Sequence, residues 1–138
     1  MDRVSPKVRS ANMSAIRSKG MKPELAVRRL VHAMGYRYRL HRHQLPGCPD
    51  MVFPSRRKVV FVHGCFWHQH ADPACKIAHR PKSNLGYWLP KLERNVARDT
   101  EHRALLTELG WDVLVIWECE VTTGDGLSDL IRDFLGHR

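Results

Sequence analysis

The sequence predicts an α/β fold in which helices flank a mixed β-sheet. Its 138 residues leave room for one hydrophobic core, and therefore for one domain. Segments with helical and with strand periodicity follow one another in the order αβββαβα. Residues 58–63 and 113–117 centre on continuous apolar runs, which are typical of strands covered on both faces. This pattern predicts a mixed sheet with helices packed against it.

The first predicted elements are a helix and a strand. The helix begins at Pro23 and ends before Gly35, with apolar residues at helical spacing between them. Residues 36–40 then alternate tyrosine or leucine with arginine. Strict alternation predicts a half-buried strand with Arg37 and Arg39 on its open face.

The remaining elements follow a turn rich in proline and glycine at residues 45–49. A short strand is predicted at 51–53 and a central strand at 58–63. Residues 64–84 lack either periodicity, and a long helix is predicted around 85–109. Two further elements complete the chain: a fully buried strand at 113–117 and an amphipathic helix marked by Leu127, Leu130, Ile131 and Phe134.

The charge balance indicates a nucleic-acid partner. Lysine and arginine number 23 against 14 acidic residues, which gives a formal net charge of +9. A compact domain with this charge repels itself unless it meets a polyanion. Basicity that serves solubility or a ribosomal role is the alternative. No stretch approaches the ~20 apolar residues of a membrane span, and no secretory signal is present, so we expect a cytoplasmic protein.

Residues 1–21 are basic and polar and carry a small apolar set that includes Met13. This composition predicts an N-terminal arm that orders on a partner, followed by a single domain at 22–138. A frayed terminus is the alternative interpretation.

Asp50 is a candidate metal ligand. It follows Pro49, so it stands at the start of a strand and after a turn that disfavours helix. If the strands 51–53 and 58–63 are neighbours, then the Asp50 carboxylate, the carbonyl of Val62 and the imidazole of His63 meet at one end of the sheet. Mg²⁺ prefers carboxylate and carbonyl oxygens, and one of its waters can attack a phosphodiester. An aspartate that only caps a turn is the alternative.

The cysteines indicate a zinc site. Disulfides are rare in a reducing compartment, so four cysteines in a cytoplasmic protein suggest metal binding or chemistry. Cys65 and Cys75 lie in the irregular segment, and Cys119 follows the last strand. Three thiolates and one imidazole make a closed structural zinc site. Periodicity does not choose between His68 and His70 as the fourth ligand, and buried cysteines without a metal are the alternative.

Phe66 and Trp67 are adjacent large apolar residues within this polar stretch. Two neighbours point in different directions, so both are not expected in the core. One use of such residues on a basic protein is as a wedge between base steps. Packing over the cysteine-rich loop is the alternative.

Asn95 and Asp99 lie four residues apart within the apolar stripe of the long helix. Polar residues in such a stripe need a partner, and a histidine is the obvious donor for the aspartate. The alternative is a helix that turns Asp99 to the solvent edge.

These motifs resemble those of the very-short-patch repair (Vsr) mismatch endonucleases. They span most of the chain in the family's order, and the string HGCFWH is highly specific. The matching strings are RSxNMxxI at 9–16, LPGxPD at 45–50, FxHGCFWHxH at 61–70, NVxRD at 95–99 and WEC at 117–119.

The resemblance implies a PD-(D/E)XK-like nuclease core with a structural zinc site, and strand-specific hydrolysis of double-stranded DNA. The cut lies on the 5′ side of the thymine in T:G mismatches that arise by deamination of 5-methylcytosine. It further implies that Mg²⁺ binds the Asp50 carboxylate and the Val62 carbonyl. His63 and His68 resemble the catalytic histidines, and Asp99 resembles the partner of His68.

The resemblance also implies roles outside this set. Glu24 is expected to contact the metal through water, and His70 to complete the zinc site with Cys65, Cys75 and Cys119. Residues assigned to DNA binding are Met13, Phe66 and Trp67, which wedge the duplex, and Asn95. The DNA-binding arm is then 1–21, and 22–138 is one endonuclease domain of a monomer, with mismatch-repair proteins as further candidate partners.

The chain departs from the family pattern at a few positions. Val62 stands where familiar members carry threonine, and the spacing from His70 to Cys75 is longer. Phe61 and His63 occupy the places of the general nuclease motif's second acid and lysine, which indicates that histidine takes over the acid–base work.

Two rival functions remain at this stage. One is a nicking endonuclease of the same family with relaxed or different mismatch specificity. The other is a zinc-stabilised DNA-binding module without catalysis. The presence of Asp50, His63, His68 and Asp99 together counts against the second, because binding alone needs no such set.

Overall fold

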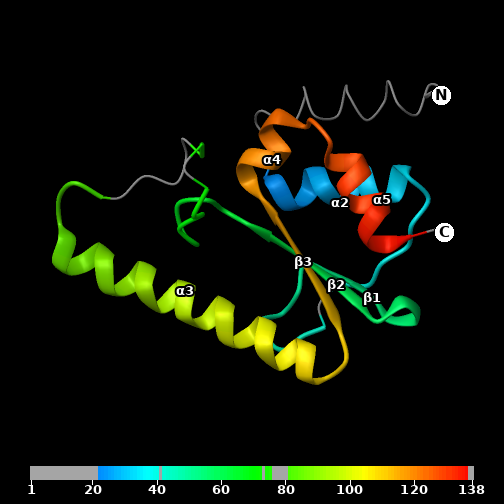
Figure 1. Cartoon of the computed structure of the whole chain (residues 1–138), viewed down its shortest axis with the longest axis horizontal. Coiled ribbons are helices and arrows are strands. Elements are labelled where there is room, and N and C mark those ends of the chain that lie inside the picture. The colour runs from blue at the N-terminus through cyan, green and yellow to red at the C-terminus, as the bar shows by residue number, and fades with distance from the viewer. Residues whose placement is uncertain (1–21, 41, 73, 76–80, 137–138) are drawn as a thin grey trace.

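The computed structural model describes residues 22–136 except 41, 73 and 76–80 (Figure 1). The predicted N-terminal arm, with Met13, lies outside the described residues. The described elements are arranged around one sheet, as the sequence predicts.

Within the described ranges the sheet has three strands, in the order β1 (Met51–Phe53), β2 (Lys58–His63) and β3 (Asp112–Trp117). β1 runs antiparallel to β2, and β2 runs parallel to β3. The prediction of a mixed sheet with a central strand at 58–63 is therefore confirmed. The parallel register pairs His63 with Trp117, so β2 and β3 end at the same edge.

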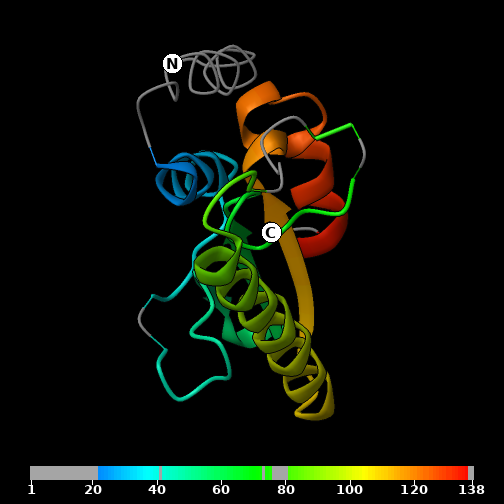
Figure 2. The same ribbon diagram turned by 90° about the vertical axis from the view of Figure 1, so that its left-hand side faces the viewer.

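Helices cover the two faces of this sheet. α2 (Pro23–Ala33), α4 (Glu118–Thr123) and α5 (Leu127–Leu135) gather on one side, and the long α3 (Leu85–Glu108) lies on the other (Figures 1 and 2). Three of these helices match predicted ones. None of the helices in the described part of the chain is long and apolar enough to cross a membrane.

Each face of the sheet has its own apolar cluster. The larger one joins Val60 and Ile116 of the sheet to α2, α4 and α5. The smaller one joins Val52, Val59 and Phe61 to Leu106 of α3. Only Leu92 and Leu106 of α3 are buried among the described residues, so this helix is held to the sheet by few side chains.

The prediction of a strand at residues 36–40 is wrong, because this segment makes only an isolated bridge. Arg39 exchanges two backbone hydrogen bonds with Val52, at 2.8 and 3.0 Å, and these form an isolated bridge. β1 is only three residues long and runs into the 3₁₀ turn η2 (Pro54–Arg56), so it offers little edge to pair with. The expected alternation still holds, with Tyr36 buried and the arginines exposed.

Residues 113–117 do form a strand, as predicted, but the prediction that this strand is fully buried is wrong. Of these residues only Ile116 is buried, and the others are half-buried. Among the described residues β3 is an edge strand of the sheet, so no described strand pairs with its other side. The short helix α4 was not predicted, because its six residues bury only Val121 and show no periodicity.

Candidate active site and metal centre

Asp50 stands at the end of a tight turn, immediately before β1. Gly47 and Cys48 have positive φ angles of 78° and 49°, so the backbone reverses just before it. Asp50 Oδ2 accepts a hydrogen bond from the backbone N–H of Val62 at 2.6 Å. The structure therefore brings Asp50 to the end of β2, beside Val62 and His63, as the sequence predicts.

The surroundings of Asp50 disfavour its charge. Burial raises the pKa of its carboxyl; the hydrogen bond from Val62 opposes this, and the nearby charge of Glu24 raises the pKa further. Arg28 and His68 act in the opposite direction. Glu24, in the first turn of α2, is thus close enough to Asp50 to act on it electrostatically.

His63 and His68 form a stacked pair. Their ring centroids are 3.8 Å apart and their planes differ by 7°. Nδ1 of His68 lies 2.5 Å from Oδ2 of Asp99 on α3, so the helix reaches the loop through this contact. Nδ1 of His63 is buried and has no hydrogen-bond partner among the described residues. Burial, and then the charge of His68, lower the pKa of His63 to about 4.

These groups share one cavity of about 350 Å³ between α3 and the sheet. Its floor comes from β2 and β3, and one wall comes from α3. The lining residues are Gly47, Cys48, Asp50, Phe61, Val62, His63, His68, Asn95, Arg98, Asp99, His102, Arg103, Val113 and Val115.

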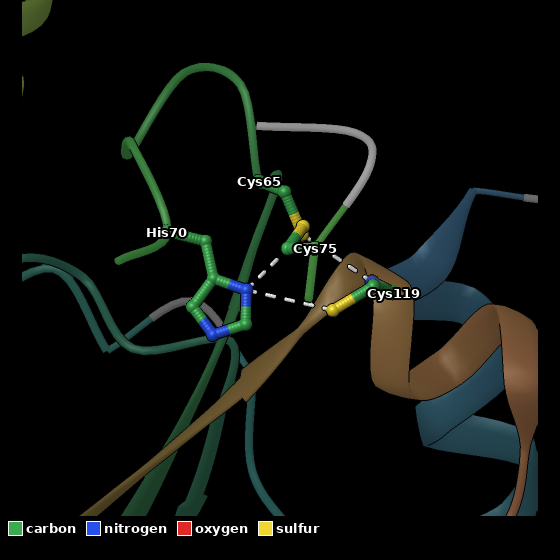
Figure 3. Close-up of side chains that lie close together, drawn as sticks. All are labelled: Cys65, His70, Cys75 and Cys119. Carbon is green, nitrogen blue, oxygen red and sulfur yellow. Dashed lines mark hydrogen bonds between the residues drawn. The ribbon is translucent and has the colours of Figure 1, made fainter. Parts of the chain in front are cut away.

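A second cluster lies beyond this cavity. The ligand atoms of Cys65, His70, Cys75 and Cys119 all lie within 4.8 Å of one another (Figure 3). Nδ1 of His70 is 3.8 Å from Sγ of Cys65 and 3.5 Å from Sγ of Cys119. Figure 3 shows three side chains that come from the loop after β2 and one from the start of α4.

Local hydrogen bonds fix this arrangement. The backbone N–H of Cys65 donates to Oε1 of Glu118 at 3.3 Å, and the N–H of Cys119 donates to Sγ of Cys65 at 3.3 Å. Oε1 of Glu120 accepts from the N–H of Trp117 at 2.9 Å, which satisfies the start of α4. Burial raises the pKa of the Cys65 thiol to about 12, so this thiol is neutral unless a cation is present.

Trp117 lies between the two clusters. Its ring stacks on His70, with centroids 4.1 Å apart and planes within 10°. Its edge also meets His63, at 5.3 Å and 78°. One indole therefore touches a residue of each cluster, a contact that sequence reasoning missed because Trp117 belongs to an apolar strand.

Phe66 and Trp67 belong to an aromatic cluster on the surface. Their rings are 5.3 Å apart, and the ring of Trp88 at the start of α3 lies 5.6 Å from Phe66 and 5.7 Å from Trp67. Trp67 is 45% exposed. Lys91 Nζ lies 5.7 Å from the centre of the Trp67 ring. Sequence reasoning missed the place of Trp88 in this cluster, because the residue lies on a long helix whose apolar positions are expected to face the sheet.

Asn95 makes internal contacts. Its Nδ2 donates to the backbone carbonyl of Trp67 at 3.1 Å, and its Oδ1 accepts from Arg98 at 2.6 Å. The sequence assigned Asn95 to DNA binding. In the structure it holds the backbone of a residue assigned to the same role.

Comparison with known proteins identifies the class. A family model described as DNA mismatch endonuclease Vsr matches residues 1–74. The type II nicking enzyme V.XorIIP of Xanthomonas oryzae pv. oryzae is 53% identical over 134 residues, which cover 97% of this chain and 96% of that protein. The type II nicking enzyme V.NmeAIP of Neisseria meningitidis is 42% identical over 129 residues, covering 91% and 90%.

The protein named DNA mismatch endonuclease Vsr in Escherichia coli K12 is 39% identical over 121 residues, which cover 88% of this chain and 76% of that protein. These similarities define the chain as an endonuclease. It belongs to the Vsr family of DNA mismatch endonucleases, and the resemblance inferred from the motifs is confirmed.

Proposed function

We propose that this chain is a Mg²⁺-dependent endonuclease that nicks one strand of double-stranded DNA on the 5′ side of the thymine in T:G mismatches. The observation that carries the proposal is the convergence of Asp50, His63, His68 and Asp99 on one cavity. DNA binding alone requires no such set of acids and histidines. The name of the Escherichia coli relative supports a mismatch as the substrate.

The donors at the end of β2 fit Mg²⁺. Asp50 is a half-buried carboxylate whose pKa is raised by burial, and Glu24 adds a second negative charge nearby. Such a pair favours a cation. The Asp50 carboxylate and the Val62 carbonyl would hold the ion, with Glu24 contacting it through water. Bound there, Mg²⁺ supplies positive charge for the phosphodiester and an activated water nucleophile.

The histidines move the proton. The Asp99 carboxylate accepts a hydrogen bond from Nδ1 of His68, which leaves Nε2 of His68 to exchange a proton with the attacking or leaving oxygen. The negative charge of Asp99 stabilises the imidazolium that forms. His63 is the second proposed catalytic histidine. It stacks on the His68 ring, which keeps that ring in its plane, and it lines the same cavity.

We further propose that the sheet and its flanking helices form a PD-(D/E)XK-like nuclease core. The order α2, β1, β2, α3, β3 carries Asp50 before the first strand, and Phe61 and His63 on the second. Residues 22–138 then form one catalytic domain, which acts as a monomer. Residues 1–21 are a DNA-binding arm, and the family match, which begins at residue 1, supports including them.

The second cluster fits a structural zinc ion. Tetrahedral zinc with Zn–S bonds of ~2.3 Å and Zn–N bonds of ~2.0 Å separates a sulfur from the nitrogen by about 3.5 Å. The two S···N distances to His70 are 3.5 and 3.8 Å. Cys65, Cys75 and Cys119 as thiolates with neutral His70 complete four ligands, so the site is closed to water. We therefore assign it to stability and not to hydrolysis.

Recognition is assigned to the aromatic cluster. Phe66 and Trp67, with Met13 from the arm, are proposed to wedge the duplex beside the mismatch. Trp88 packs against both rings and supports them. The exposure of Trp67 supports this role, since a residue that only covers the loop need not face solvent.

A second candidate function is a nicking endonuclease with relaxed or different mismatch specificity. The names of the Xanthomonas and Neisseria relatives, both type II nicking enzymes, favour it. The residues of the cavity serve both functions equally, so the substrate has to separate them.

The test is a nicking assay on end-labelled duplexes that carry each mismatch in several sequence contexts, with Mg²⁺. We expect a single nick 5′ of the thymine in T:G duplexes and none in the matched duplex. Comparable nicking of several mismatches would support the second candidate. No Mg²⁺-dependent nick on any duplex would overturn both.

A further inference from the structure

The cavity extends past the proposed catalytic groups, along the next turn of α3. We propose that His102 and Arg103 form a phosphate subsite that holds a second phosphodiester of the cut strand, beside the one at Asp50. This inference rests on the proposed function and adds a site that positions the strand for cleavage.

Helical geometry places the subsite. Asp99 and Arg103 are four residues apart on α3, which is about one turn, or about 6 Å along the axis. His102 and Arg103 line the same cavity as Asp99. Leu106, one turn further, is fully buried and anchors this part of the helix to the sheet.

His102 is held against the turn that leads to Asp50. A Cβ atom on Gly47 would lie 2.9 Å from Nδ1 of His102 and 3.1 Å from its Cβ and Cγ. The imidazole therefore packs directly on the backbone of Gly47, whose φ of 78° also favours glycine. The contact between Gly47 and His102 therefore holds the imidazole of His102 in the cavity wall, next to the turn that leads to Asp50.

Arg103 brings a positive charge without an acidic partner among the described residues. Arg103 lines the same cavity as His63 and His68, so its charge lies on the wall that holds the proposed catalytic groups. Phe61, Val113 and Val115 give the cavity an apolar floor. Arg103 itself is exposed at the rim of this cavity, so its guanidinium is open to a phosphate of bound DNA.

The chemistry of the subsite matches a phosphodiester. A guanidinium donates paired hydrogen bonds to phosphate oxygens, and an imidazole N–H can donate another. Arg98 lines the cavity too, but it already donates to Asn95 at 2.6 Å and so belongs to the part of the wall that supports Trp67. The unpaired cation nearest His102 is therefore Arg103, within the described part of the cavity wall.

The first experiment removes the charge. Arg103→Gln should lower kcat/KM for nicking of the mismatched duplex about 10- to 100-fold, the range for one charged hydrogen-bond contact. The slope of log K for duplex binding against log salt should fall in magnitude by about 0.9, the value for one lost phosphate. Arg132→Gln removes the same charge from α5, on the other face of the sheet, and should change neither quantity.

The second experiment identifies the phosphate. Neutral methylphosphonates replace, one at a time, the phosphates that flank the cut. At one position the substitution should impair the unaltered protein but cause no further loss in Arg103→Gln. In His102→Leu, the methylphosphonate at that position should likewise cause little further loss of nicking. His102→Gln keeps a hydrogen-bond donor, so its nicking should again be sensitive to the methylphosphonate in part.

The subsite is overturned if Arg103→Gln matches Arg132→Gln in kcat/KM and in salt slope. It is also overturned if the losses from Arg103→Gln and from each methylphosphonate simply multiply at every position. The salt slope needs no cleavage, so it tests the subsite even if the unaltered protein nicks no mismatch, an outcome that overturns the proposed function instead.

Discussion

The imidazole of His68 makes two contacts that fix its plane and its tautomer. Nδ1 lies 2.5 Å from Asp99, and the ring stacks on His63 at 3.8 Å. From the sequence, Asp99 could be recognised as a polar residue in an apolar stripe that needs a partner. Which histidine it meets depends on a loop without periodicity, so only the family resemblance pointed to His68.

At this scale the first prediction concerns Asp50. Asp50→Asn keeps the shape and can still accept the hydrogen bond from Val62, but it removes the charge proposed to anchor Mg²⁺. Nicking of T:G duplexes should fall by about 10³-fold or more, while duplex binding persists. Asp125→Asn, at an exposed position in the turn after α4, provides the control. Near-normal Mg²⁺-dependent nicking by Asp50→Asn would contradict the metal assignment.

The second prediction concerns stability and pH at the same residue. Because burial raises the pKa of Asp50, the folded state favours the protonated form. The associated stability is present below the unfolded pKa, near 3.9, and is lost as pH rises through the folded value. Without Mg²⁺, Asp50→Asn should therefore melt at a higher temperature than the unaltered protein at pH 7.

This difference should shrink as the pH is lowered toward 4, where Asp50 itself becomes neutral. Added Mg²⁺ should raise the melting temperature of the unaltered protein but not that of Asp50→Asn. Thermal unfolding followed by circular dichroism measures both effects. A variant that is less stable at pH 7 without Mg²⁺ would show that the carboxylate charge is already compensated within the fold.

At the scale of elements, α4 is six residues long and carries one proposed zinc ligand. It starts directly after β3, where Glu120 accepts the N–H of Trp117, and Cys119 follows at its second position. The sequence predicted a cysteine cluster but not this helix, since its residues show neither apolar periodicity nor a run of buried side chains. The structure thus adds the element that brings Cys119 to a loop 54 residues away from it in sequence.

The third prediction follows from that cluster. Purified protein should contain one zinc ion per chain, measured by atomic emission, and Cys119→Ser should lose it together with several degrees of melting temperature. Nicking at low temperature should fall less than stability does. Cys48→Ser alters an exposed cysteine outside the cluster and should keep the zinc. Well-folded, active protein without bound zinc would refute the assignment.

At the scale of the whole molecule, the two faces of the sheet have different uses. The face under α2, α4 and α5 holds the larger apolar cluster, and the face under α3 holds the cavity. These two faces could be expected from the sequence, because β2 is a continuous apolar run and α3 is a long segment with helical periodicity. What the sequence could not supply was the edge position of β3, because an apolar run looks the same in a central and an edge strand.

The last prediction joins the charge of the molecule to its aromatic cluster. Wedging a duplex costs a few kcal/mol of unstacking per step, and a mispaired step costs less to open. Trp67 is placed for this use, since it is exposed at 45% while Asn95 holds its carbonyl and Lys91 lies over its ring. Trp67→Ala should therefore sharply reduce cleavage of a T:G duplex. Nonspecific binding, set by the net charge of +9, should remain almost unchanged.

The control is Leu109→Ala, which removes another exposed apolar side chain, just after the far end of α3. It should leave both cleavage and binding intact. Tryptophan fluorescence should be quenched when mismatched DNA is added, and less so in Trp67→Phe, because the indole then no longer stacks on bases. Normal T:G cleavage by Trp67→Ala would remove the wedge from the mechanism. Loss of folding in that variant would instead make Trp67 a packing residue, since a side chain that meets only DNA contributes little to the stability of the free protein.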